Sequence, residues 1–166
     1  AYIPVHAYGY PVNPALIANL SKRRIVVEDA ACALGSFTLQ GQAAILSFHA
    51  TKTITTGEGG MVVTNDGTIA ERARKLRDQK HGHHLAYNYR MTEIQGAIGQ
   101  EQMKRLPWIL EWRKTIAALY DRAFEGRIKA RIPPRGGNYQ SYVLLLDDDD
   151  RESVILGLRA SSVEAL

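Results

Sequence analysis

Short runs of β-branched and small apolar residues alternate with helical patterns along this chain. Such runs lie at residues 2–5, 24–27, 43–48 and 61–64. The alternation predicts an α/β domain with a largely parallel or mixed sheet. In sheets of this kind, functional side chains gather at the carboxyl ends of the strands. The residues that follow each run are therefore the first candidates for a functional site.

Helical spacing of apolar residues and capping patterns indicate where the helices lie. Thr68 with Glu71, and Thr92 with Gln95, form capping-box patterns that predict two helix starts. We expect the second helix to end near Pro107, because proline disrupts a helix interior, and a separate helix to stop near Gly126. The expected helices cover residues 14–20, 68–79, 93–106, about 109–126 and 151–158.

A proline- and glycine-rich stretch at residues 133–137 reads as a linker, and a strand-like run follows at residues 139–146. This strand and the last helix are too small to form a domain alone. We therefore expect a partial large domain over residues 1–126 and the truncated start of a smaller domain over residues 127–166. The chain begins without Met and directly in a strand-like segment, which indicates a fragment.

The composition excludes several classes of protein. With 45% hydrophobic and 23% charged residues, the chain is typical of a globular domain. No apolar run approaches the roughly 20 residues that span a bilayer, and no secretory signal opens the sequence, so we expect a cytoplasmic protein without membrane contact. The net charge is +4, but the basic residues are scattered, which argues against nucleic-acid binding. The single cysteine, Cys32, excludes an intrachain disulfide.

Three polar residues follow two of the buried strand-like runs. Asp29 ends one run, and Ser47 and Lys52 bracket the end of the next. A lysine, a carboxylate and a hydroxyl are the groups that pyridoxal phosphate (PLP) requires of a protein. Spacing alone leaves another interpretation open, because a loop lysine is commonly solvated and an acid after a strand commonly caps a turn.

Several blocks of sequence resemble, in order, those of the DegT/DnrJ/StrS family of PLP-dependent sugar aminotransferases. The resemblance implies part of a fold-type-I (aspartate aminotransferase-like) large domain with a mixed, mostly parallel sheet, and the start of a small α+β domain. The blocks are VEDAA at residues 27–31, SFHATK at 47–52, TTGEGG at 55–60 and YNYRMTE at 87–93, with PVHAYG at 4–9 before them.

The resemblance also implies roles for individual residues. Lys52 corresponds to the lysine that forms a Schiff base with the cofactor and moves the proton. Asp29 corresponds to the partner of the pyridine nitrogen, and Ser47 to a ligand of the phosphate. Asn88 resembles the residue that reaches the phosphate bound by a second subunit, which implies a homodimer with shared sites.

Two further residues of this region are candidates for cofactor contact. His49 lies within the SFHATK block, and a buried structural histidine is an equal alternative. Cys32 stands where the family commonly has glutamine or histidine near the phenolic oxygen of the cofactor, and a thiol is a poor hydrogen-bonding substitute. Residues 36–42 look shortened relative to the family, which would distort the sheet beside the site.

The function implied by the resemblance is transamination of a nucleotide-linked keto-sugar to an amino sugar, with glutamate or glutamine as the amino donor. A PLP-dependent sugar dehydratase is an alternative that Lys52 disfavours, because a histidine replaces the lysine in those enzymes. The third interpretation is an inactive, truncated remnant that keeps the fold or the dimer surface.

No metal site is expected. His81, His83 and His84 lack accompanying cysteine or carboxylate ligands at metal spacing. The acidic run at residues 147–150 lacks the alternating ligands and the glycine of a calcium loop. A polar loop and a helix cap explain the two segments.

Overall fold

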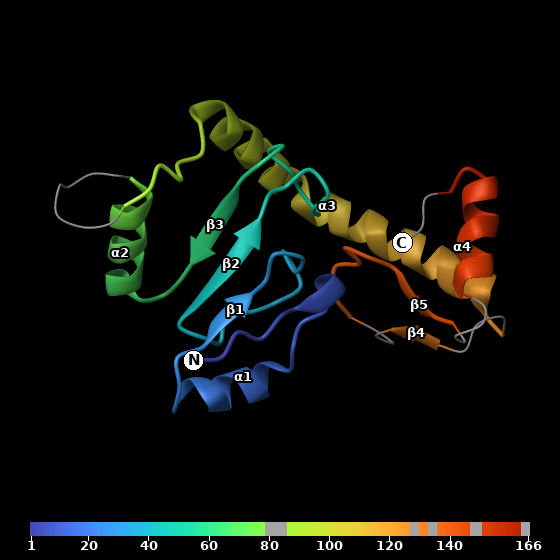
Figure 1. The fold of residues 1–166 in the computed structure, drawn as a ribbon, viewed down its shortest axis with the longest axis horizontal. Coiled ribbons are helices and arrows are strands. Elements are labelled where there is room, and N and C mark those ends of the chain that lie inside the picture. The colour runs from blue at the N-terminus through green and yellow to red at the C-terminus, as the bar shows by residue number, and fades with distance from the viewer. Residues whose placement is uncertain (79–85, 127–129, 133–135, 147–150, 164–166) are drawn as a thin grey trace.

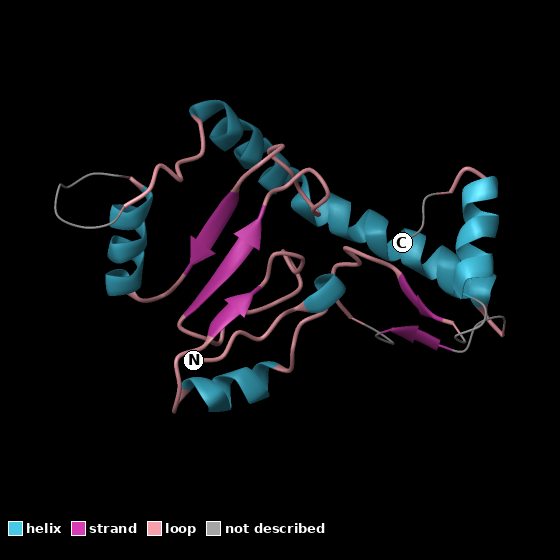
Figure 2. Ribbon diagram, in the orientation of Figure 1, coloured by secondary structure: helices cyan, strands magenta, loops and turns pink. Residues whose placement is uncertain are grey.

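The computed structural model describes residues 1–78, 86–126, 130–132, 136–146 and 151–163. A three-stranded sheet and a two-stranded sheet lie along one long helix, with shorter helices around them (Figures 1 and 2). The predicted α/β class is confirmed. No helix in the described ranges is long and apolar enough to cross a membrane.

The larger sheet is mixed. It contains β1 (Val27–Asp29), β2 (Ala43–Ser47) and β3 (Gly60–Val63) in that order. β1 and β2 are parallel, and β3 is antiparallel to β2. The strand predicted at residues 24–27 begins later than expected. The strand predicted at residues 2–5 is present only as two isolated bridges, one at each end of the run.

The connection between β1 and β2 spans residues 30–42, and the ladder that it joins is regular. Val27 lies opposite Ala43 and Asp29 opposite Ile45. The expected distortion of the sheet is therefore not observed. The buried carboxylate of Glu28 explains this regularity, because its Oε1 accepts the backbone amides of residues 40 and 41 at 2.7 and 2.6 Å and so anchors the connection.

The first two helices begin at side-chain caps. The Asn13 side chain caps α1 (Pro14–Ser21), as expected for a helix with proline in its first turn. In α2 (Gly67–Arg77), Asp66 is the cap, and its Oδ1 accepts the amides of Thr68 and Ile69. The predicted capping box of Thr68 with Glu71 is wrong, because Asp66 lies two residues earlier and reaches the same free amides.

The long helix α3 (Glu93–Phe124) begins at the predicted capping box, in which Thr92 and Gln95 bond each other's backbone. The predicted break at Pro107 is wrong, because the helix runs through it. An interior proline costs about 3 kcal/mol. The hydrogen bonds along 32 residues and the packing of Leu110 against Gly35 outweigh this local cost.

The second sheet pairs β4 (Ala130–Ile132) with β5 (Val143–Leu145) in antiparallel fashion, and α4 (Arg151–Ala160) follows. β5 is shorter than the predicted strand at residues 139–146, and β4 was not predicted at all. The division of the chain into residues 1–126 and 127–166 stays a prediction.

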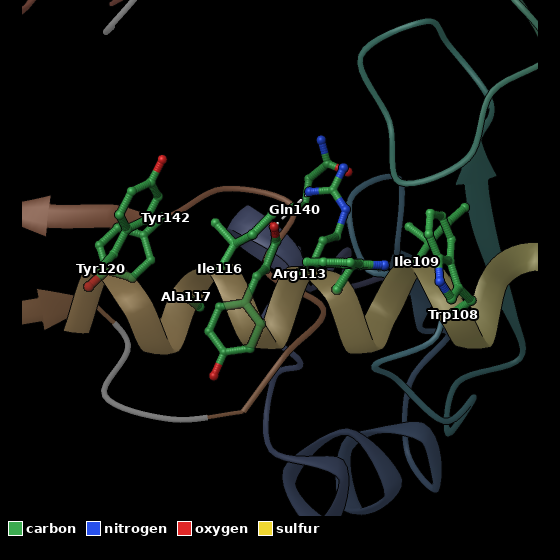
Figure 3. A pocket seen from close by; sticks show the side chains of 10 residues that line it. Trp108, Ile109, Arg113, Ile116, Ala117, Tyr120, Gln140 and Tyr142 are labelled. Carbon is green, nitrogen blue, oxygen red and sulfur yellow. Dashed lines mark hydrogen bonds between the residues drawn. The ribbon is translucent and has the colours of Figure 1, made fainter. Parts of the chain in front are cut away.

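The core beside the larger sheet is built of small residues. Ala30, Ala33 and Ala44 are buried together, and partly buried apolar side chains pack against them. Large apolar side chains on α3 are instead exposed, and Trp108, Trp112 and Leu119 each leave more than half of their surface accessible. Several line a groove of about 430 Å³ between α3 and the segment before β5 (Figure 3).

Candidate functional site

Two of the predicted site residues end neighbouring parallel strands. Asp29 is the last residue of β1, and Ser47 is the last residue of β2. Because β1 and β2 are parallel, both residues lie at the same edge of the sheet. The turn that carries Lys52 follows β2 at this edge, as Figure 1 shows from the course of the chain after β2. Asp29, Ser47 and the turn that carries Lys52 therefore lie at one edge of the sheet.

Lys52 is half-buried. Its backbone amide donates to the carbonyl of His49 at 3.0 Å, which closes the turn. Its Nζ donates to the Sγ of Cys32 at 3.2 Å. This contact joins the loop after β2 to the loop after β1 and distinguishes Lys52 from a solvated surface lysine.

Asp29 lies in a half-buried position at the end of β1. Its Oδ1 accepts the amide of Ala31 at 3.0 Å, and its own amide donates to the carbonyl of Pro4 at 2.9 Å. The turn-capping interpretation is thus correct as far as Oδ1 is concerned. It does not exclude a cofactor contact, because Oδ2 takes no part in that bond.

A buried pair lies one residue before Asp29 and was missed from the sequence. His6 Nε2 lies 2.9 Å from Glu28 Oε2, and both side chains are fully enclosed. His6 Nδ1 accepts the amide of Val12 at 3.0 Å, so the ring proton lies on Nε2 and is donated to Glu28. No local sequence pattern pairs these two residues, because they lie 22 positions apart.

Ser47 and His49 form a hydrogen bond at the start of the turn after β2. The backbone amide of His49 donates to Ser47 Oγ at 3.3 Å. The buried-histidine interpretation of His49 is wrong, because 46% of its side chain is exposed. The ring Nδ1 accepts the amide of Thr51 at 3.2 Å, which holds the ring over the turn. Contact of His49 with a cofactor stays a prediction.

Asn88 lies on a different part of the chain, after α2, where its backbone pairs with Asp78. Its side chain is exposed, and its Oδ1 accepts from Arg90 Nε at 3.2 Å. Arg90 therefore orients the Asn88 side chain. The position of Asn88 outside the Lys52 cluster is compatible with a role toward a second subunit.

The sequence profile of the DegT/DnrJ/EryC1/StrS aminotransferase family matches residues 1–166. The chain belongs to this family. Its fold agrees with that of solved aminotransferases: TlmJ from Streptoalloteichus hindustanus superposes with a TM-score of 0.90 at 28% identity, over 98% of this chain and 50% of TlmJ. The aminotransferase PseC from Helicobacter pylori, involved in the biosynthesis of pseudoaminic acid, gives 0.87 at 27% identity, over 96% and 49%. The predicted partial fold-type-I architecture is confirmed.

Curated relatives of the chain include GDP-perosamine synthases. That of Escherichia coli O157:H7 is 39% identical over 135 residues, which cover 72% of this chain and 37% of the relative. That of Vibrio cholerae is 31% identical over 186 residues, covering 99% and 51%. The chain thus spans about half, or less, of the length of the curated relatives that it matches.

Metal binding finds no support in the part of the chain that the structure describes, where no three His, Cys, Asp or Glu side chains form a group able to hold an ion. The histidines at positions 81, 83 and 84 and the acidic run at residues 147–150 lie outside the described residues. The sequence-based prediction about these two segments therefore stays a prediction.

Proposed function

We propose that this chain is part of a PLP-dependent aminotransferase that converts a nucleotide-linked keto-sugar into the corresponding amino sugar. The observation that carries the proposal is the contact of Lys52 with Cys32 across the carboxyl edge of two parallel strands that end in Asp29 and Ser47. Family membership and the sugar aminotransferase relatives support the reaction class.

The donor set at this edge fits PLP in kind. A half-buried amine, a half-buried carboxylate and a hydroxyl belong to Lys52, Asp29 and Ser47. These are the groups needed for covalent attachment, for the ring nitrogen and for the phosphate. By the family resemblance, Cys32 stands where glutamine or histidine is common, so we expect a weaker hydrogen bond to the cofactor there.

When bound, PLP supplies an electron sink for the carbon that loses a proton. Lys52 Nζ would hold the cofactor and move that proton. Asp29 would lie against the pyridine nitrogen, where its negative charge would keep that nitrogen protonated. Ser47 Oγ would contact the phosphate, and the His49 ring lies over the same turn.

The partners follow from the same proposal. The substrates are a nucleotide-linked keto-sugar and an amino donor, glutamate or glutamine. Asn88 would contact the cofactor phosphate bound by a second subunit, and the enzyme would then be a homodimer with shared sites. The exposed position of Asn88 supports this arrangement. A cytoplasmic location belongs to the proposal as well.

The inactive-remnant interpretation is the alternative, and it makes a different prediction. Under this interpretation, the chain folds but does not bind PLP. The dehydratase interpretation remains disfavoured by Lys52, because that chemistry uses a histidine at this position.

The deciding experiment adds PLP to the purified protein, reduces it with borohydride and maps the labelled peptide. We expect the phosphopyridoxyl label on Lys52 and transamination activity, and loss of both in Lys52→Ala. The matched control is Lys104→Ala, which removes an exposed lysine of α3 and leaves both intact. Label on another lysine, or activity in Lys52→Ala, would refute the assignment, and absence of label would favour the remnant.

A further inference from the structure

Four segments that are distant in the sequence meet beside Lys52. They are the turn η1 (Ala7–Gly9), the loop after β1, the turn that carries Lys52, and the segment before β5. Figure 1 shows the last of these beside η1, at the junction of the two sheets. Two amide side chains, Asn138 and Gln140, make most of the bonds that hold the junction together.

Asn138 holds the loop that carries Cys32. Only 2% of its surface is exposed. Its Nδ2 contacts the carbonyl oxygens of Cys32 at 2.8 Å and Leu34 at 3.0 Å. Its Nδ2 also lies 3.3 Å from Thr53 Oγ1, and its Oδ1 accepts the amide of Gln140 at 2.8 Å. A buried amide with this many partners is a fixed point of the structure.

Gln140 holds both neighbours of Lys52. Its Nε2 donates to the carbonyl of Thr51 at 2.7 Å, and its Oε1 accepts from Thr53 Oγ1 at 2.9 Å. Lys52 lies between these two attachments, and its Nζ donates to Cys32. Asn138 and Gln140 therefore hold both ends of the Lys52–Cys32 contact from one short segment.

Glycines allow the backbones of η1 and the segment before β5 to lie close together. A Cβ at Gly9 would lie 1.8 Å from Asn138 Oδ1, so only glycine fits there. Gly137 has φ +93°, and a Cβ on it would lie 2.7 Å from the carbonyl oxygen of Gly9. Because the two segments lie this close, the backbone N–H of Asn138 donates to the carbonyl of Gly9 at 3.1 Å.

Arg113 holds the same segment from the side of α3. It donates from a guanidinium nitrogen to the carbonyl of Tyr139 at 2.8 Å. Figure 3 shows Arg113 reaching from α3 toward Gln140. Burial lowers the pKa of the Arg113 guanidinium, in keeping with its enclosed position. The segment is thus held on both sides.

We propose that Asn138 and Gln140 are positioning residues that set where Lys52 Nζ lies relative to Cys32 and the strand ends. The inference rests on the proposed function, in which Lys52 carries the cofactor. Misplacement of a reacting group by about 1 Å costs up to about 100-fold in rate. Loss of a contact on either side of Lys52 therefore reduces turnover more than substrate binding.

The first test compares Gln140→Ala with Gln100→Ala, a matched change at an exposed position of α3. In cofactor-free protein, Gln140→Ala makes hydrogen exchange in residues 49–56 about tenfold faster, because hydrogen bonds to that turn are lost. The amides of β2 and β3 exchange as in wild type. In PLP-loaded protein, kcat falls about tenfold with KM unchanged, and the pH midpoint of the cofactor absorbance shifts. Gln100→Ala changes none of these.

The second test uses Thr53, whose hydroxyl contacts both amides. Thr53→Val keeps the volume and removes the hydroxyl, whereas Thr53→Ser keeps the hydroxyl. We expect Thr53→Val to reproduce the exchange, kcat and absorbance changes and Thr53→Ser to restore wild-type behaviour. If Gln140→Ala does not fold, the comparison of Thr53→Val with Thr53→Ser tests the positioning role.

The outcomes separate the two proposals. If wild-type protein takes no label at Lys52, the proposed function fails, and the positioning role fails with it. If wild-type protein is labelled but Gln140→Ala and Thr53→Val keep its kcat and absorbance midpoint, only the positioning role is overturned. Faster exchange in the turn without a change in kcat would also overturn it, because Gln140 would then be merely structural.

Discussion

His6 Nε2 donates to Glu28 Oε2 at 2.9 Å inside the protein, one residue before the proposed partner of the cofactor ring. The same carboxylate accepts two backbone amides from the connection between β1 and β2. Glu28 therefore joins the amino-terminal segment, β1 and that connection. Of the two adjacent acids, Glu28 therefore supports the fold, and Asp29 lies at the edge of the sheet.

Replacing Glu28 should destabilise the protein strongly. Glu28→Ala leaves the buried Nε2–H of His6 and two part-buried backbone amides without their acceptor. Each unsatisfied group costs about 1–3 kcal/mol, so we expect a loss of about 3–5 kcal/mol in the free energy of unfolding. Urea denaturation measures this loss. Glu111→Ala is the control, because it removes an exposed ion pair with Lys114 and should cost less than about 1 kcal/mol. Equal losses for the two variants would show that the buried acid does not support the fold.

Asp29→Asn should lower the transamination rate without changing the stability of the fold. The asparagine Oδ1 still accepts the amide of Ala31, so the turn after β1 and the unfolding transition should change little. The negative charge that favours a protonated pyridine nitrogen is lost, and we expect transamination to fall by at least about 100-fold. Kinetics with a keto-sugar nucleotide measure the effect. Asp66→Asn, at the exposed cap of α2, is the control and should keep full activity.

Pro107→Ala tests whether α3 is one helix. In a continuous helix, alanine restores a backbone donor and removes the clash of the proline ring, so we expect stabilisation by about 1–3 kcal/mol. If Pro107 instead began a second helix, proline would be favoured there and alanine would give no gain. Urea unfolding of Pro107→Ala beside Gln100→Ala distinguishes the two arrangements.

The exposed apolar face of α3 should make the 166-residue chain associate or bind apolar dyes. Trp108, Trp112 and Leu119 expose apolar surface along the helix, and contiguous surface of this kind favours association. Light scattering and anilinonaphthalene sulfonate fluorescence measure both effects. Trp112→Lys should weaken them, whereas Lys114→Arg, on the same helix, should not. A monomeric chain without dye fluorescence would contradict the prediction.

The larger sheet and its edge could be predicted because their signals are local. The apolar runs predicted β2 and β3 to within a residue or two, and the strand ends placed Asp29 and Ser47 together. The capping box at Thr92 was correct for the same reason. The break at Pro107 was wrong because local propensity does not include the bonds and packing of the whole helix.

The contacts around Lys52 could not be predicted, because they depend on pairing across most of the chain. Nothing near Asn138 or Gln140 in the sequence indicates that their amides reach residues 32, 51 and 53. The role of Glu28 likewise depends on His6, which lies in another segment. Hydrophobic periodicity does not carry such polar, long-range information.

Asn138 bonds the carbonyl of a residue that precedes it by 106 positions. During synthesis, the segments that carry Cys32 and Lys52 leave the ribosome long before this partner does. The turn that carries Lys52 therefore reaches its final geometry only after the residues up to 140 have emerged. A nascent chain arrested before that point would present the lysine in an unfinished setting, even with β1, β2 and β3 already paired.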